Sequence, residues 1–248
     1  MVNYYDTIFK RKSVRKYNQL PVSDSILKEL SEFIKELTPL YDSIEIKIDI
    51  TGLNEVKTLL PYKAPRYLLY YSQNCDGYLT NAGYILAQVD LFLSSKGIGT
   101  CYYGMAQPTK ENQASTELEY VVMLAFGNSA EPVHRTKISE FKRKPLSQIT
   151  DSNNYKELLE AVRLAPSASN SQNWYFKEEQ GTIHAYCTKC GMIKAMLYEK
   201  MNQVDMGIAL FHLKAAADHF NKDITFVADN NAKENPPNGY YYVLSARL

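Results

Sequence analysis

Apolar and polar residues alternate over several short stretches of the chain, as expected for strands with one buried face. Between residues 44 and 50 every second residue is isoleucine and the residues between them are charged. A period of two predicts a half-buried strand there. Continuous apolar runs at 67–71 and 120–126 predict more deeply buried strands. We expect three further strands at 182–187, 224–228 and 240–244.

Four other segments show the spacing of amphipathic helices. We expect helices over residues 26–37, 80–96, 155–164 and 205–220. The clearest is 80–96, where Gly97 supplies a stop after an apolar face made of Ile85, Val89, Phe92 and Leu93. Ser23 or Asp24 can cap the first helix. The mixture predicts an α+β fold with a mixed sheet.

The order of these elements repeats along the chain. The matches, at offsets of 120 to 128 residues, are 28–30 with 156–158, 38–39 with 165–166, 81–83 with 205–207, and 121–124 with 241–244. Units of α+β structure resemble one another in any case. Four matches in one order at a nearly constant offset nevertheless favour an internal duplication. We therefore divide the chain into a first half (1–130), a crossing linker (131–150) and a degenerate second half (151–248).

Composition and charge exclude some classes of protein. The 248 residues are 45% hydrophobic and 22% charged, with a formal net charge of +1. This balance argues against a broad surface for nucleic acid or for an anionic membrane. No apolar stretch is long enough to span a bilayer, and the polar, basic N-terminus does not look like a secretion signal. We expect a cytoplasmic protein.

The cysteines and histidines give weak signals. Four cysteines in a reducing compartment are expected to be free thiols. Cys187 and Cys190 form a lone Cys-x-x-Cys without a second ligand pair, and we expect no strand–turn–helix setting around them. A chance pair near a loop is the plainer interpretation. The four histidines are scattered and are interpreted as packing or surface residues.

Three segments carry candidate chemistry. Residues 11–17 place Arg11, Lys12 and Arg15 around Ser13, a set of donors that suits a phosphate but also occurs on solvated surfaces. Residues 165–174 contain Pro166, Ser167, Asn170 and Gln172, which can border a flat ring or simply form a polar turn. Residues 95–104 contain Gly97, Ile98 and Gly99 after a helix, and Tyr102 excludes a dinucleotide fingerprint.

Together with Phe141 to Leu146, these segments resemble the nitroreductase-like FMN family. Its members typically show Arg-Arg-Ser-x-Arg, Pro-Ser-x-x-Asn-x-Gln-Pro-Trp, Gly-Leu-Gly-Thr and a late Lys-x-Arg near Pro-Leu. The corresponding segments here are 11–15, 166–174, 97–100 and 141–146. The resemblance implies a three-layer α/β/α fold with a mixed, mainly antiparallel sheet, internally duplicated here.

The resemblance also implies roles for individual residues. Arg11, Lys12, Ser13 and Arg143 would bind the FMN phosphate, and Arg15 would reach the pyrimidine edge of the ring, where positive charge favours the reduced flavin. Pro166, Ser167 and Asn170 would line the cofactor from the second half. Ile98 and Gly99 would present backbone near N5. No side chain is required as a catalytic acid or base, and no metal is expected.

The implied activity is ping-pong hydride transfer from NADH or NADPH, through FMN, to a nitroaromatic, quinone or similar small acceptor. Two alternatives stay open: a protein that holds FMN as a sensor, a store or a vestige, and a structural protein without flavin. The sequence decides neither the nicotinamide nucleotide nor the acceptor.

The chain departs from the family pattern in one informative way. Family members are usually homodimers with FMN at the subunit interface. Here the Arg-rich segment occurs only in the first half and the Pro-Ser segment only in the second. The chain therefore resembles such a dimer fused into one polypeptide, and we predict one FMN per chain. A monomeric pseudo-dimer and a homodimer of such chains are both compatible with the sequence.

Overall fold

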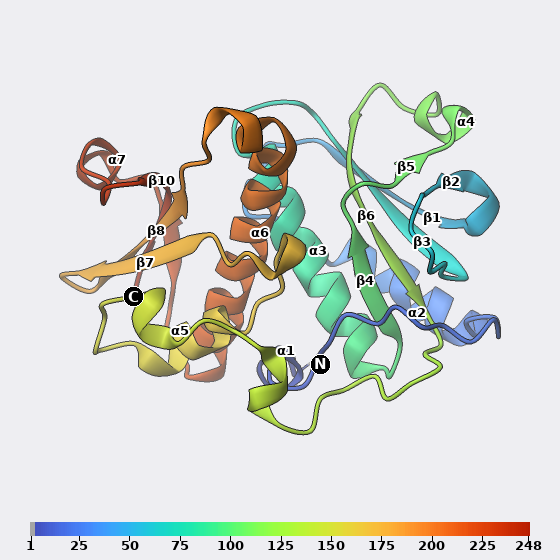
Figure 1. Cartoon of the computed structure of the whole chain (residues 1–248), viewed down its shortest axis with the longest axis horizontal. Coiled ribbons are helices and arrows are strands. Elements are labelled where there is room, and N and C mark those ends of the chain that lie inside the picture. The colour runs from blue at the N-terminus through green and yellow to red at the C-terminus, as the bar shows by residue number, and fades with distance from the viewer. Residues whose placement is uncertain (1–2) are drawn as a thin grey trace.

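The computed structural model describes residues 3–248, apart from the side chains of residues 192–197. Two four-stranded antiparallel sheets flank a pair of long helices (Figure 1). The first sheet has the order β1-β3-β6-β4, formed by Ile46–Gly52, Arg66–Ser72, Glu119–Gly127 and Gly99–Tyr103. The second has the order β7-β8-β10-β9, formed by Trp174–Glu179, Thr182–Thr188, Tyr240–Arg247 and Thr225–Val227. A small sheet pairs β2 (Val56–Lys57) with β5 (Gln107–Pro108).

The central helices are α3 (Tyr78–Ser95) and α6 (Met192–His219), which run side by side between the sheets (Figure 1). Shorter helices lie around them: α1 (Tyr4–Ile8), α2 (Asp24–Lys35), α4 (Lys110–Gln113), α5 (Lys156–Arg163) and α7 (Asn230–Glu234). Four 3-10 turns complete the fold: η1 (Leu53–Glu55), η2 (Ile138–Phe141), η3 (Leu146–Gln148) and η4 (Ala168–Asn170). Ser23 caps α2 by accepting the Ile26 N–H, one of the two caps expected.

Two glycines allow the central helices to approach each other closely. A Cβ on Gly83 of α3 would lie 1.9 Å from the carbonyl oxygen of Val204 on α6. A Cβ on Gly207 of α6 would lie 1.9 Å from the carbonyl oxygen of Thr80 on α3. Backbone therefore meets backbone at this crossing, and a side chain at either position would separate the helices.

A continuous hydrophobic core fills the space between the sheets. Leu68 and Tyr70 of β3 point into it, whereas Tyr67, Leu69 and Tyr71 point to the outer face. That outer face is covered by Val14, Tyr17, Val56 and neighbouring residues of two loops. Because both faces of β3 are buried, its sequence is a continuous apolar run, as expected.

The layer order and the strand directions correct the expected architecture. The layers are sheet, helices, sheet in place of α/β/α, since loops cover the outer face of the first sheet. Every named strand pair is antiparallel, and the parallel pairings are two isolated bridges, Ser13 with Thr100 and Thr150 with Phe176. The sheets are therefore antiparallel and not mixed.

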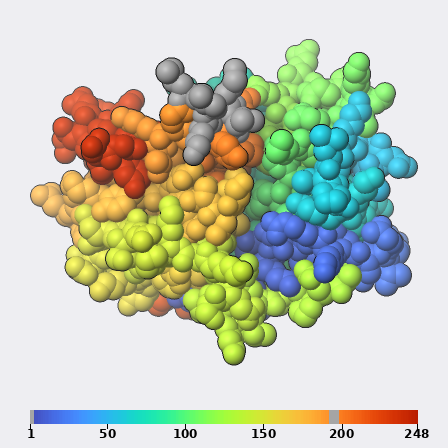
Figure 2. Space-filling view, in the orientation of Figure 1, coloured from blue at the N-terminus to red at the C-terminus, as the bar shows by residue number. Residues whose placement is uncertain are grey.

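The α+β class and six expected strands are confirmed, within a few residues at their ends. α6 begins at residue 192, well before the expected start at 205, and β2, β4, β5 and β7 are not among the expected strands. In the space-filling view the halves of the chain lie on opposite sides, and the segment between them runs along the lower edge (Figure 2). Among the described helices, none combines the length and apolar character needed to cross a bilayer.

Candidate functional site

A cleft opens between the two halves of the chain, beside α6. It holds about 540 Å³ of space, part of it open to solvent. From the first half it is lined by Ser13, Arg15, Cys101, Tyr102, Gly104 and Val122. From the second half it is lined by Pro166, Ser167, Ala168, Ser169, Met201, Val204, Asp205 and Ile208. A concave site lined from two parts of a chain is a usual setting for a small-molecule ligand.

The N-terminal segment reaches the cleft by pairing with β4. Val14 donates its backbone N–H to the Thr100 carbonyl at 2.8 Å, and the Val14 side chain lies where a Cβ on Gly99 would clash, at 2.8 Å. This pairing places Ser13 and Arg15, on either side of Val14, at the wall of the cleft. The exposed guanidinium of Arg15 lies 6.0 Å from the centre of the Tyr62 ring.

Arg11 anchors the same segment from within the protein. Its Nε lies 3.2 Å from Oδ2 of Asp90 on α3, and both side chains are 1% exposed. Arg11 also donates from Nη2 to the Ser13 hydroxyl at 3.1 Å. Arg11 is therefore a buried, paired cation that positions Ser13 at the cleft.

Two further arginines from the linker lie beside Arg11. Arg135 donates to the Arg11 carbonyl, and Arg143 donates to the carbonyls of Phe141 and Leu164 at 3.0 and 3.2 Å. Burial and the neighbouring Arg11 lower the pKa of Arg135 to about 10. Burial, Arg11 and Arg135 lower the pKa of Arg143 to about 9. Within the described chain, the Nε of Arg143 is buried without a hydrogen-bond partner.

The turn after α5 forms the opposite wall and contains left-handed residues. Ser169 has φ 53° and Asn170 has φ 56°. The Ser167 hydroxyl accepts the Gln172 N–H at 3.0 Å, and Asp205 accepts the Ala168 N–H with both carboxyl oxygens, at 2.9 and 3.1 Å. The Asn170 side chain accepts from Arg143 and donates to the Lys142 carbonyl at 3.0 Å. These bonds fix the turn against α6 and the linker.

The structure therefore brings together most of the residues expected from the sequence. Ser13, Arg15, Pro166 and Ser167 line the cleft. Arg11, Arg143 and Asn170 form the adjoining polar cluster, joined to the cleft through Ser13.

Three expected residues lie elsewhere. Lys12 is directed to Glu131, with Nζ 3.6 Å from Oε1. Ile98 is buried in the core, and Gly99 begins β4 beneath Val14. β4 begins at Gly99, away from the cleft, and reaches the cleft at its other end. The lining therefore comes from Tyr102 near the end of β4 and from Gly104 just after it.

Sequence reasoning did not identify Tyr102, Gly104, Met201 or Asp205 as site residues. At Gly104 a Cβ would lie 2.6 Å from the Met201 sulfur, a contact between distant segments that the sequence does not reveal. Asp205 carried a signal, because a carboxylate on an otherwise apolar helix face needs an explanation.

Two other polar groups lie outside this cleft. Cys187 belongs to β8 and Gly191 caps α6, so the Cys-x-x-Cys does lie between a strand and a helix, contrary to expectation. All four cysteines are free.

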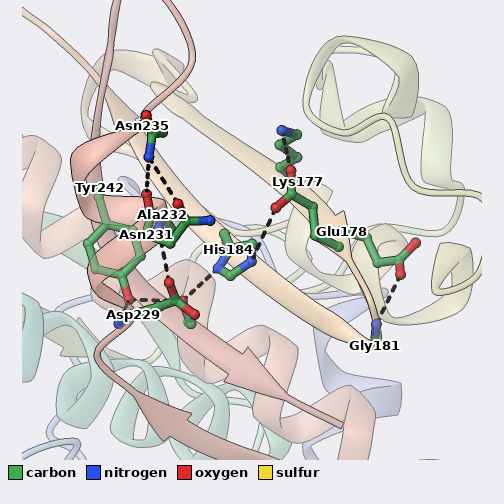
Figure 3. Close-up of polar contacts among 11 residues, drawn as sticks. Lys177, Glu178, Gly181, His184, Asp229, Asn231, Ala232, Asn235 and Tyr242 are labelled. Carbon is green, nitrogen blue, oxygen red and sulfur yellow. Dashed lines mark hydrogen bonds and ion pairs between the residues drawn. The ribbon is translucent and has the colours of Figure 1, made fainter.

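On the second sheet, His184 bonds to the buried Ser245 hydroxyl at 2.7 Å, and Tyr242 bonds to the same hydroxyl at 2.8 Å, near Asp229 of the α7 cap (Figure 3). Ser245 is fully buried, so we assign this group to packing.

A second cleft also lies between the two halves of the chain. Its walls include Leu40, Thr80, Phe226 and Ala228, which match Ser167, Val204, Tyr102 and Gly104 in the order of elements. Tyr41 lines it, and the Tyr41 ring lies 2.7 Å from the position that a Cβ on Gly77 would take. The charged residues that line it are Asp76 and Lys233.

Comparisons with known proteins agree with this architecture. A solved structure from Thermotoga maritima, described as a putative nitroreductase, is 19% identical, with 100% of this chain and 94% of that chain covered and a TM-score of 0.68. A nitroreductase from Desulfitobacterium hafniense with bound FMN is 13% identical, with 58% and 100% covered and a TM-score of 0.42. An iodotyrosine deiodinase bound to FMN and 3-iodo-L-tyrosine is 18% identical, with 54% and 92% covered and a TM-score of 0.40. No curated protein matches.

The first of these shows the same fold over the whole chain, and the other two are distant structural relatives that bind FMN. A family model described as "Putative TM nitroreductase" matches residues 3–217, which include nearly all of the first half, the linker, the second half as far as α6, and the residues that line the cleft. The chain belongs to this nitroreductase family, which implies an oxidoreductase.

Proposed function

We propose that the protein is an FMN-dependent oxidoreductase that takes hydride from NADH or NADPH and reduces a nitroaromatic, quinone or similar small acceptor. The observation that carries the proposal is the joint cleft. Ser13 and Arg15 of one half face Pro166 and Ser167 of the other, next to a cluster of buried arginines. Both segments that resemble the FMN family thus meet at one site.

The arginine cluster supports a phosphate site. Arg135 and Arg143 are partly buried beside Arg11, and burial together with the charge of Arg11 lowers the pKa of both. Among the described residues, Asp90 forms an ion pair with Arg11 alone. A bound phosphate would offset this excess of positive charge and would give the buried Nε of Arg143 an acceptor. Arg11 would act mainly by positioning Ser13.

The cleft supports a flat ring. Pro166 and Ser167 offer small side chains on one wall, and Tyr102 and Gly104 form part of the other. The exposed guanidinium of Arg15 can hold negative charge at a ring edge. When bound, FMN would supply the hydride chemistry, while this chain would orient it and leave one face accessible.

We further propose that the chain is a fused pseudo-dimer with one FMN. The elements α2, β1, β3, α3, β4 and β6 recur in order as α5, β7, β8, α6, β9 and β10, and the two sheets have the same strand order under this match. The contacts of Gly83 and Gly207 are reciprocal, as in a two-fold interface. The described residues that line the second cleft include no arginine.

Steady-state kinetics test the activity. Rates are measured with NADH and with NADPH against a quinone and a nitroaromatic, at several fixed acceptor concentrations. Parallel lines in double-reciprocal plots, typical of ping-pong transfer, are expected. If the protein binds FMN but reduces neither acceptor class with either nucleotide, the alternative of an FMN-binding protein without efficient turnover is the better account.

A further inference from the structure

One buried carboxyl group of the cleft has no charged partner. Asp205 lies on α6, is 5% exposed and lines the cleft. Both of its oxygens accept the Ala168 N–H. Within the described part of the chain it forms no ion pair. An unpaired carboxylate is costly to bury, so the group needs a reason to be there.

The other half of the molecule shows that holding the turn does not require a carboxyl. Asn81 of α3 occupies the position that matches Asp205, two residues before Gly83 as Asp205 is before Gly207. Its Oδ1 accepts the N–H groups of Leu40 and Tyr41 at 2.8 and 3.1 Å, in the turn after Pro39. A neutral amide therefore holds the corresponding turn in the same way. The carboxyl group of Asp205 occurs at the cleft that adjoins the arginine cluster.

The surroundings of Asp205 favour its protonated form. Burial raises the pKa of Asp205 to about 8, although the Ala168 N–H opposes the shift. Tyr102 of β4 and Cys187 of β8 face it, and burial also raises the pKa of each of these groups, so both are neutral at pH 7. Cys101 and Arg15 lie on the same cleft wall, and burial raises the pKa of the Cys101 thiol as well. At neutral pH Asp205 thus carries a proton beside the ligand space.

We propose that Asp205 is the proton donor of this cleft, serving the acceptor while it receives hydride. The inference rests on the proposed function. Reduction of a quinone to a hydroquinone consumes one hydride and one proton. The hydride comes from the reduced cofactor. The hydride becomes the hydrogen of one new hydroxyl group. The O–H bond of Asp205 breaks as a new O–H bond forms on the other acceptor oxygen, and a proton from solvent water then restores the carboxyl group.

The protonation state is tested without turnover. Infrared spectra of the protein without cofactor are compared between the wild type and D205N. We expect a protonated-carboxyl carbonyl band at pH 7 that is absent in D205N and disappears from the wild type above about pH 8. D229N is the matched control, since Asp229 also accepts a backbone N–H, from Ala232 at 2.9 Å, but lies at the cap of α7 (Figure 3). That variant should keep the band. Its absence from the wild type would overturn the proposal.

The donor role is tested by separating the two half-reactions in stopped-flow experiments. Hydride transfer from NADH or NADPH needs no proton from the protein, so D205N should be reduced at the wild-type rate. Reoxidation by a quinone should slow on the order of a hundredfold, the usual contribution of a general acid. Equal slowing of both half-reactions, or of neither, would overturn the role. If wild-type protein binds no FMN, the proposed function fails and the donor role with it, whatever the infrared result.

Discussion

Gly83 and Gly207 contact each other's helices reciprocally: each lies against the backbone carbonyl of the residue three positions before the other. Thr80, Gly83 and Tyr84 of α3 meet Val204, Gly207 and Ile208 of α6 at one constant offset. This crossing joins the two halves and positions α6, with Asp205, against the cleft wall.

Alanine at either glycine should therefore destabilise the protein strongly. Its methyl group would lie 1.9 Å from a backbone carbonyl, which cannot move without separating the helices. We expect a loss of about 3 kcal/mol or more in the free energy of unfolding for G83A or G207A, measured by urea denaturation. G52A is the control, because its nearest neighbour is 4.0 Å away and its backbone is extended. Wild-type stability in G83A would contradict the close approach.

Loss of the Arg143 guanidinium should weaken FMN binding. R143Q removes a partly buried cation with a free Nε, so we expect the dissociation constant for FMN to rise about tenfold or more. Quenching of flavin fluorescence measures it. R247Q removes the same charge from an exposed site at the end of β10 and should bind FMN normally. Equal affinities for the two variants would argue against a phosphate at the arginine cluster.

The buried pair of Arg11 and Asp90 should be sensitive to removal of one partner. D90N leaves the Arg11 cation buried without its counter-charge, at a cost of about 3–5 kcal/mol in unfolding free energy. Replacing both residues, as in R11M with D90L, should recover much of that stability, since neither charge then stays buried. If the double variant is as unstable as the sum of the two single variants, the pair is not energetically coupled.

His212 predicts a loss of stability in acid. It is fully buried, and burial, together with Arg11 and Arg143, lowers its pKa to about 3. The unfolded chain binds a proton near pH 6.5, so stability should fall as pH decreases from about 6.5 towards 3. H212Q, which introduces the residue type of Gln88 at the matching position of α3, should flatten this acid limb in thermal unfolding. Asp205 contributes in the opposite direction, because its raised pKa adds stability as the pH falls from about 8 to about 4. Wild type and H212Q share that contribution, so the difference between their pH profiles isolates His212.

Much of the fold could be predicted from periodicity, because the strands and helices with strong apolar patterns bury one face or two. The layer order could not, because it depends on how α3 and α6 meet, and the glycines that permit this show no periodicity. The start of α6 was missed because residues 192–204 have helix-forming composition without a clear apolar face.

The candidate site followed mainly from the family resemblance. Local chemistry indicated that residues 11–15 and 166–170 could bind a phosphate and a ring, and the structure brings both to one cleft. Sequence could not show that Arg11 pairs with Asp90, nor that Tyr102 and Gly104 line the opening in place of Ile98 and Gly99. Those facts depend on contacts between segments far apart in the chain.

The most direct test of the account is the absorbance spectrum of the purified protein, supplemented with FMN and freed of unbound cofactor, before and after anaerobic addition of NADH or NADPH. The account predicts flavin bands that correspond to one FMN per chain and that bleach when a nicotinamide nucleotide is added. A protein that retains no flavin, or whose flavin bands persist with both nucleotides, would contradict it.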